Sequence, residues 1–98
     1  MPPVHFKQNE KGDSIFFMEE EGERIAEMVT GISGNEMTVY HTEVFPKGEG
    51  RGLGKELLHA MRDYARVNSL QVIPICPFVL AQFARHPEQY ADIWKKKK

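Results

Sequence analysis

The chain has 98 residues, of which 41% are hydrophobic, and a formal net charge of −1 at pH 7. This length and composition predict one small domain, residues 1–98, with a single core, and exclude a disordered chain. The near-zero charge argues against a nucleic-acid or anionic-membrane surface, and no apolar run approaches the roughly 20 residues that span a bilayer.

The N-terminal segment 1–5 lacks the charged and apolar regions of a signal peptide. A single cysteine cannot form an internal disulfide, which favours a reducing compartment. We therefore expect an intracellular protein in the cytoplasm. Four lysines end the chain at 95–98, and we interpret them as a solvated helix end; a localisation or nucleic-acid signal is the alternative.

The first half of the chain predicts an antiparallel meander. Strand-forming residues alternate in stretches separated by turn signals such as Lys11-Gly12-Asp13 and Gly34-Asn35. The charged run Glu19–Glu23 is interpreted as a solvated hairpin tip. The expected strands are Val4–Asn9, Ser14–Met18, Arg24–Ser33 and Met37–Phe45.

The second half predicts a strand–helix–strand unit. An apolar stripe indicates a helix from Leu53 to about Asn68, and Leu70–Ile75 follows as a strand that is apolar on both faces, typical of a buried parallel strand. Pro74 cannot donate to a sheet ladder, so we expect this strand to splay away from its neighbour and leave a cleft. Two short helices should follow: Pro77–Arg85, and a last one from Pro87 that carries Tyr90, Ile93 and Trp94.

Between the two halves, glycines occupy alternate positions that lead into the predicted helix, in the order Gly48, Gly50, Gly52 and Gly54. Glycines let the backbone approach a ligand and direct successive N–H groups at one spot. The helix that follows adds the positive end of its dipole. The segment therefore predicts a phosphate or pyrophosphate site; a tight strand-to-helix corner without a ligand is the alternative.

This order of elements resembles the GNAT family of N-acetyltransferases, whose acetyl-CoA motif is (Arg or Gln)-x-x-Gly-x-(Gly or Ala). Gly52 and Gly54 match the motif, whereas Glu49 replaces the expected Arg or Gln. A small subgroup of about this length is more similar still. It carries a His-Thr pair, a cysteine after the splayed strand and a His-Pro-Glu, here His41-Thr42, Cys76 and His86-Pro87-Glu88.

The resemblance implies a minimal α/β (α+β) fold of the GNAT type, with splayed parallel strands and short C-terminal helices. It also implies that the chain binds acetyl-CoA as co-substrate and transfers the acetyl group to an amine. The implied donor contacts are Val44, Phe45, Gly50, Arg51, Gly52, Leu53, Gly54 and Lys55, with Lys47, Arg51 or Lys55 on the remaining phosphate. The walls of the acceptor pocket are reduced, so a large acceptor or a second copy in a homodimer would complete it.

Two residues are candidates for the chemistry. Cys76 follows a parallel strand and precedes a helix, where the dipole favours a thiolate; it would take the acetyl group or line the donor site, and a small buried hydrophobe is the alternative. His41, placed in phase with Val39 and Glu43, would deprotonate the amine or Cys76. A histidine hydrogen-bonded inside the sheet is the alternative for His41.

Two rival functions remain open at this point. The first is a module that binds coenzyme A or acyl-CoA without catalysis, which the reduced acceptor walls, Glu49 and the absence of tyrosine from 77–85 favour. The second is a scaffold whose glycine loop is only a turn. The four histidines and one cysteine show no spacing typical of metal ligands, so no metal is expected.

Overall fold

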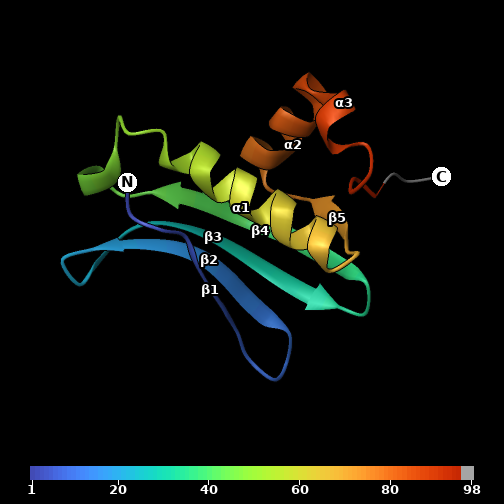
Figure 1. The fold of residues 1–98 in the computed structure, drawn as a ribbon, viewed down its shortest axis with the longest axis horizontal. Coiled ribbons are helices and arrows are strands. Elements are labelled where there is room, and N and C mark those ends of the chain that lie inside the picture. The colour runs from blue at the N-terminus through green and yellow to red at the C-terminus, as the bar shows by residue number, and fades with distance from the viewer. Residues whose placement is uncertain (96–98) are drawn as a thin grey trace.

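The computed structural model describes residues 1–95 and contains one five-stranded sheet in the order β1-β2-β3-β4-β5. The first four strands form an antiparallel meander, and β5 pairs parallel to β4. This mixed sheet confirms the predicted fold class (Figure 1). The strands are β1 (His5–Gln8), β2 (Asp13–Glu20), β3 (Glu23–Ser33), β4 (Glu36–Val44) and β5 (Gln71–Pro74).

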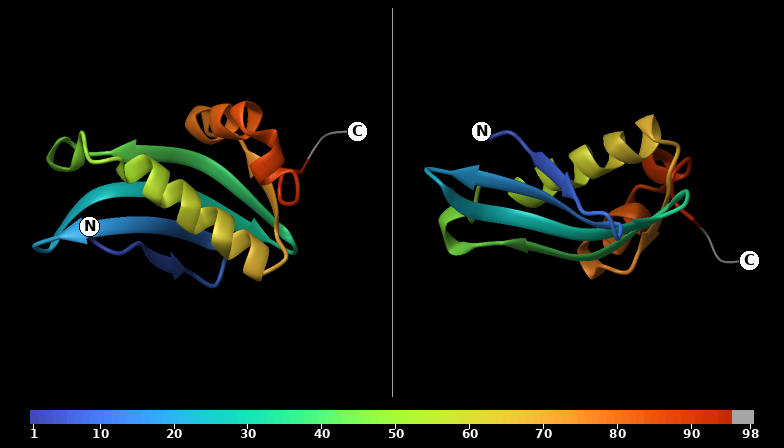
Figure 2. Two further views of the ribbon diagram at one scale, coloured as in Figure 1. Left: turned by 45° about the horizontal axis from the view of Figure 1, so that its top comes forward. Right: turned by 90° about the horizontal axis from the view of Figure 1, so that it is seen from below.

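The long helix α1 (Leu53–Val67) connects β4 to β5 and crosses one face of the sheet (Figures 1 and 2). A 3₁₀ turn, η1 (Pro46–Gly48), precedes it, and α2 (Pro77–Arg85) and α3 (Pro87–Tyr90) follow β5. The predicted apolar stripe faces the sheet, because its positions recur at helical spacing and are buried in the core. The predicted positions Leu53, Leu57, Met61 and Ala65 are buried, and the predicted Ala60 and Tyr64 are partly buried. Leu58 is buried as well, although the predicted stripe did not include it.

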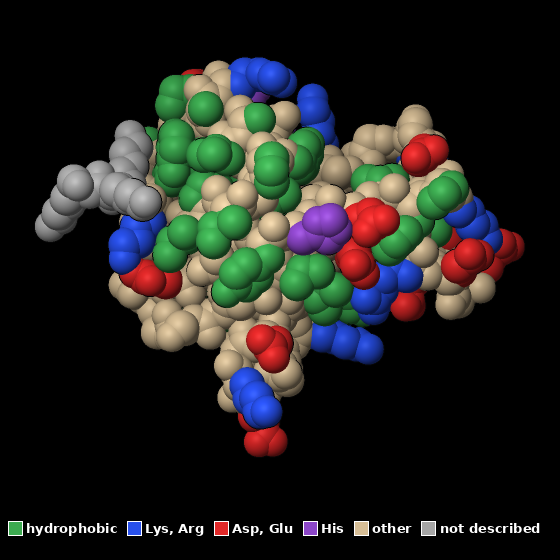
Figure 3. Space-filling model, turned by 180° about the vertical axis from the view of Figure 1, so that it is seen from behind, with side chains coloured by type: hydrophobic (Ala, Val, Ile, Leu, Met, Phe, Trp, Pro, Cys, Tyr) green, Lys and Arg blue, Asp and Glu red, His purple; other side chains and the backbone are tan. Residues whose placement is uncertain are grey.

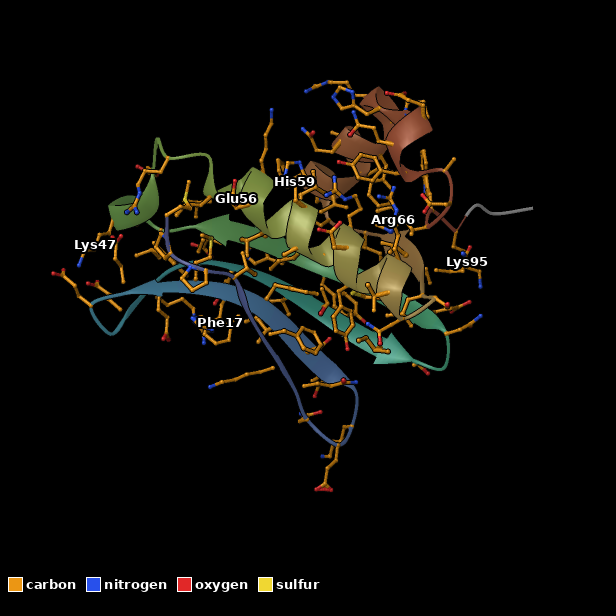
Figure 4. The ribbon with its side chains drawn as sticks, in the orientation of Figure 1. Phe17, Lys47, Glu56, His59, Arg66 and Lys95 are labelled. Carbon is orange, nitrogen blue, oxygen red and sulfur yellow. The ribbon has the colours of Figure 1, made fainter. Side chains whose placement is uncertain are left out.

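The register of the sheet decides which side chains face α1. Phe16 lies opposite Met28, which lies opposite Thr42. The ring of Phe16 meets that of Tyr64 on α1, with centroids 5.7 Å apart. This row therefore faces the helix. Because successive side chains of a strand point to opposite faces, the neighbouring row through Phe17 points away from α1, as Figure 4 shows for that residue.

A β-bulge interrupts β4 at Tyr40. Thr30 of β3 lies opposite Val39, but the preceding Val29 lies opposite His41, so Tyr40 is an extra residue without a partner. The prediction that His41 lies in phase with Val39 is therefore wrong. Val39 is buried on the α1 face, whereas the inserted residue shifts the alternation and leaves His41 exposed on the other face.

The predicted splay between the parallel strands is present. The last pair between β4 and β5 is Val39 with Pro74, and β4 continues to Val44 without β5 beside it. The amides of Ile75 and Cys76 both donate to the carbonyl of Val39, at 3.1 and 2.8 Å. The chain then turns into α2 instead of following β4, because Pro74 offers no N–H to extend the ladder.

The C-terminal segment differs from the prediction. The last helix ends at Tyr90, and Trp94 forms a parallel bridge with Val72 on the outer edge of β5. The prediction that Ile93 and Trp94 belong to that helix is wrong, since backbone bonds to a sheet edge compete with a second helical turn. Lys95 contacts Glu36; the interpretation of the lysine tail otherwise lies outside the described residues. Within residues 1–95, no helix is long and apolar enough to cross a membrane.

Candidate functional site

The glycine loop joins the end of β4 to the start of α1. Gly50 and Gly52 adopt left-handed backbone angles, with φ of 78° and 72°, which residues with a side chain rarely adopt. Gly48 is needed for a different reason: a Cβ there would lie 2.7 Å from the carbonyl oxygen of Ile25 and 2.7 Å from Leu53 Cδ1. The loop thus passes over β3 with no room for a side chain and then turns sharply into the helix.

The helix start leaves a group of backbone amides without partners. The first helical bond runs from the Glu56 amide to the Gly52 carbonyl, at 3.3 Å. Gly52 is the N-cap and offers no side-chain oxygen to the amides of Leu53 to Lys55. In the described part of the chain, no backbone carbonyl accepts from the amides of 50–55. Free N–H groups at the positive end of a 15-residue helix form a ready anion site.

Gly54 shapes the same helix start through packing. A Cβ on Gly54 would lie 3.3 Å from Cζ of Phe78, at the start of α2. The small residue therefore lets α2 approach the first turn of α1, next to the end of β5. Leu53 is 1% exposed, so only its backbone is available to a ligand.

The cations of the loop are paired with carboxylates of the β2–β3 hairpin. Arg51 donates from both terminal nitrogens to the two oxygens of Glu20, each at 2.8 Å. Lys47 lies 3.1 Å from Glu23 and 3.4 Å from Glu21, and its side chain reaches toward the hairpin in Figure 4. The bond from Arg51 lowers the pKa of Glu20, and the bonds from Glu23 and Glu21 raise the pKa of Lys47.

These contacts change the interpretation of the charged run Glu19–Glu23. Glu19 and Glu20 belong to β2, and the turn itself consists of Glu21 and Gly22, both with positive φ. The prediction of a solvated tip is therefore incomplete, because three of its carboxylates contact the glycine loop. Nothing in the local sequence indicates this role, since the partners lie 24 to 31 residues away.

Cys76 lies at the splay, at the N-cap of α2, where the sequence predicts it. Its side chain is buried on the α1 face, 2% exposed, and its thiol donates to the hydroxyl of Thr42 at 3.3 Å. The structure thus brings together two of the motif residues, one from each diverging strand end. The sequence does not predict the contact between Thr42 and Cys76, because the strand pattern does not reveal which side chain of β4 faces the gap.

His41 lies on the opposite face of β4 from the contact between Thr42 and Cys76. Its side chain is 56% exposed, and its Nε2 lies 3.2 Å from a carboxylate oxygen of Glu43. Figure 3 shows this side of the molecule from behind, with apolar side chains exposed among charged ones. The structure therefore separates the two predicted catalytic residues: Cys76 faces the helix, and His41 faces the open side.

The remaining predicted residues lie where β4 meets the loop. Val44 pairs with Ala26, and the amide of Phe45 donates to the Ile25 carbonyl at 3.0 Å. These bonds fix the end of β4 beside the splay. No group of three or more His, Cys, Asp or Glu suited to a metal ion occurs among residues 1–95.

Comparisons with known proteins agree with this geometry. A family model described as GCN5-related N-acetyl-transferase matches residues 15–93. The chain belongs to this family. A comparison with curated proteins gave no match.

Solved structures share the fold. A GCN5-like protein from Staphylococcus aureus, solved by NMR, is 29% identical over 100% of this chain and 94% of its own, with a TM-score of 0.67. The Escherichia coli ribosomal-protein-S18-alanine N-acetyltransferase is 22% identical, with a TM-score of 0.63; the match covers 83% of this chain and 53% of that one. The aminoglycoside N-acetyltransferase AAC(6')-Iy, solved with CoA, is 15% identical over 89% of this chain and 71% of its own, with a TM-score of 0.53. This chain thus spans nearly all of the staphylococcal protein but about half of the E. coli enzyme.

Proposed function

We propose that this protein binds acetyl-CoA at the glycine loop and transfers its acetyl group to an amine. The observation that carries the proposal is the set of unpartnered amides at the start of α1, behind two glycines with left-handed angles. Such amides suit the pyrophosphate of coenzyme A without a large basic patch. Membership of the acetyltransferase family and the fold shared with a CoA complex support the same donor.

The splay provides a place for the reactive end of the donor. Extended from the loop along β4, the donor would bring its thioester to the gap where Thr42 and Cys76 meet. In the transfer, the amine nitrogen forms a bond to the acetyl carbon, the carbon–sulfur bond breaks, and the thiolate leaves with its electron pair. The nitrogen then releases one proton, which the thiolate takes up to become the thiol of coenzyme A. An ammonium group must first lose a proton to a base.

His41 is our candidate for that base. It faces the open side of the sheet, where an acceptor has access, and its contact with Glu43 would orient the imidazole. Cys76 would line the donor side. Its burial and its distance from the open face argue against attack on the thioester as the main route, although acetylation of its thiol is an outcome that the experiment below detects.

A non-catalytic CoA-binding module is the second candidate. The observation that favours it is the placement of Cys76 and His41 on opposite faces of β4. Incubation with acetyl-CoA labelled in the acetyl group, alone and with polyamines or lysine peptides, separates the two functions. Label on the amine supports the enzyme, label on the protein that Cys76→Ala removes supports a covalent step, and tight binding without transfer supports the module.

Binding itself is tested by calorimetry with coenzyme A and acetyl-CoA. Gly52→Asp should abolish the heat of binding, because it adds a negative charge at the anion site. Gly34→Asp is the matched control: Gly34 has a φ of 59° and open space around its Cβ position, like Gly52, but lies in the β3–β4 turn. If the wild-type chain releases no heat with either compound, the proposed function is wrong.

A further inference from the structure

We infer that Glu20 is a positioning residue that holds the glycine loop through Arg51. We also infer that Lys55 is the loop cation that contacts the phosphates of the donor, because the other two are paired with carboxylates. This inference rests on the proposed function, since it concerns how the same loop binds coenzyme A. The acetyl-CoA motif that this chain matches in part lies within the loop, whereas Glu20 lies on β2, 31 residues before Arg51.

The ion pair between Arg51 and Glu20 directs the guanidinium toward the β2–β3 hairpin. Both terminal nitrogens of Arg51 and both oxygens of Glu20 take part, at 2.8 Å each. Parallel N–H···O bonds of this kind fix orientation as well as distance. About a third of each side chain is exposed, 34% for Arg51 and 36% for Glu20. Lys47 contacts the neighbouring carboxylates of Glu21 and Glu23, and its positive charge reduces their repulsion of Glu20.

The position of Arg51 in the chain explains what the pair would stabilise. Arg51 lies between Gly50 and Gly52, both in left-handed conformations that glycine leaves easily. A flexible glycine pair would let the amides at the helix start turn away from a common point. Fixing the one side chain between the two glycines restrains both peptide planes before a ligand arrives, which lowers the ordering cost of binding.

Lys55 differs from the other two loop cations. It is exposed in the first turn of α1, and it has no ion pair in the described part of the chain. Its backbone amide belongs to the unpartnered group, so its side chain begins beside the predicted pyrophosphate. Lys55 can therefore contact a phosphate without giving up an existing carboxylate partner, whereas Lys47 and Arg51 cannot.

Calorimetry with coenzyme A on single and paired variants tests the inference. Glu20→Gln should weaken binding about 3- to 10-fold, because a positioned charge-assisted contact is lost at a partly exposed site. Arg51→Glu should weaken it further through repulsion. The exchanged pair, Glu20→Arg with Arg51→Glu, restores the contact with its charges reversed and should bring the dissociation constant back to within about 3-fold of wild type. Lys55→Gln should weaken binding in every background.

Asp92→Asn is the matched control. Asp92 makes the same kind of two-nitrogen contact with Arg66, at 2.7 and 3.1 Å, beside the far end of α1 (Figure 4 labels Arg66). Its loss should leave the affinity for coenzyme A unchanged. In ligand-free protein, the NMR order parameters of the backbone amides of 50–55 should fall in Glu20→Gln and stay at the wild-type values in Asp92→Asn.

The alternative is that Arg51 itself contacts a phosphate and Glu20 merely competes for it. Glu20→Gln would then bind coenzyme A as well as wild type or more tightly, and the exchanged pair would stay as weak as Arg51→Glu; either result overturns the inference. Unchanged order parameters for these amides in Glu20→Gln also overturn it. A wild-type chain that binds no coenzyme A refutes the proposed function instead, and the order parameters still decide whether Glu20 holds the loop.

Discussion

Replacing Gly52 by alanine should cost stability and donor binding through one cause, the left-handed backbone angle. A residue with a Cβ pays about 1–2 kcal/mol in this region, and Gly52 has a φ of 72°. No other atom lies within 4 Å of the Cβ position, so steric overlap adds nothing. For a domain of this size, the loss corresponds to a fall in Tm of about 4–16 °C.

The effect on binding follows from how the chain relieves this strain. If residue 52 moves to a negative φ, the amides at the start of α1 no longer point at one spot. Each bond lost between an amide and a charged phosphate weakens binding about 10-fold or more. Asparagine tolerates the left-handed region better than alanine, so Gly52→Asn should retain more stability and more affinity than Gly52→Ala.

Gly34→Ala separates the two effects. Gly34 has a φ of 59° with open space around it, so alanine should cost a similar amount of stability there. It lies in the β3–β4 turn, away from the loop, so the affinity for coenzyme A should not change. Urea denaturation and calorimetry on both variants make the comparison. Equal losses of affinity in the two variants, or no loss of stability in Gly52→Ala, would refute the reasoning.

Two further predictions concern the stability of the fold. The hydroxyls of Ser14 and Thr30 are buried and 2.6 Å apart. Thr30→Val should therefore destabilise the protein by about 1–3 kcal/mol in urea denaturation, because it leaves the Ser14 hydroxyl without its partner. Adding Ser14→Ala should recover most of this loss, whereas additive losses would contradict the pairing. The bond from Arg66 lowers the pKa of Asp92 below its usual 3.8, so the pair stabilises the fold at neutral pH, and its contribution is lost as the pH falls from 3.8 through the lowered pKa. The Tm of Asp92→Asn should therefore lie below that of wild type at pH 7 and converge with it in acid; a constant difference across this range would argue against the linkage.

Much of the fold could be predicted because its signals are local. Alternating strand formers, two turn signals and an apolar stripe of helical period place the meander and α1, and Pro74 predicts where the parallel pair ends. The glycine loop is equally local, since the turn, the helix start and the amides that they leave free all lie within a few residues.

The features that sequence reasoning missed depend on contacts between distant segments. Whether Arg51 points toward a ligand or toward Glu20 is decided by the packing of β2 beside the loop, which no window of sequence contains. The C-terminal error has a similar origin: Trp94 has helical spacing from Tyr90, but the open edge of β5 takes its backbone instead. The periodicity of a sequence describes one helix or strand at a time, whereas these contacts depend on how two segments pack against each other.

The bulge at Tyr40 shows how one residue can change the predicted site. Val39 and His41 both have direct partners on β3, so removing the residue between them should leave every other side chain on its present face. We expect the Tyr40 deletion to fold, with a stability within about 1 kcal/mol of wild type, because its exposed ring contributes little. A bulge also bends its strand. The deletion should therefore straighten β4 toward β5, narrow the splay and weaken acetyl-CoA binding.

Tyr40→Ala is the matched variant, because it removes the ring but keeps the residue count and hence the bulge. Calorimetry should find its affinity for acetyl-CoA near wild type, while the deletion binds more weakly. If both variants lose affinity equally, the ring and not the bend is what the donor requires. If the deletion binds as well as wild type, Pro74 alone separates the strands, and the bulge serves only to place His41 on the open face.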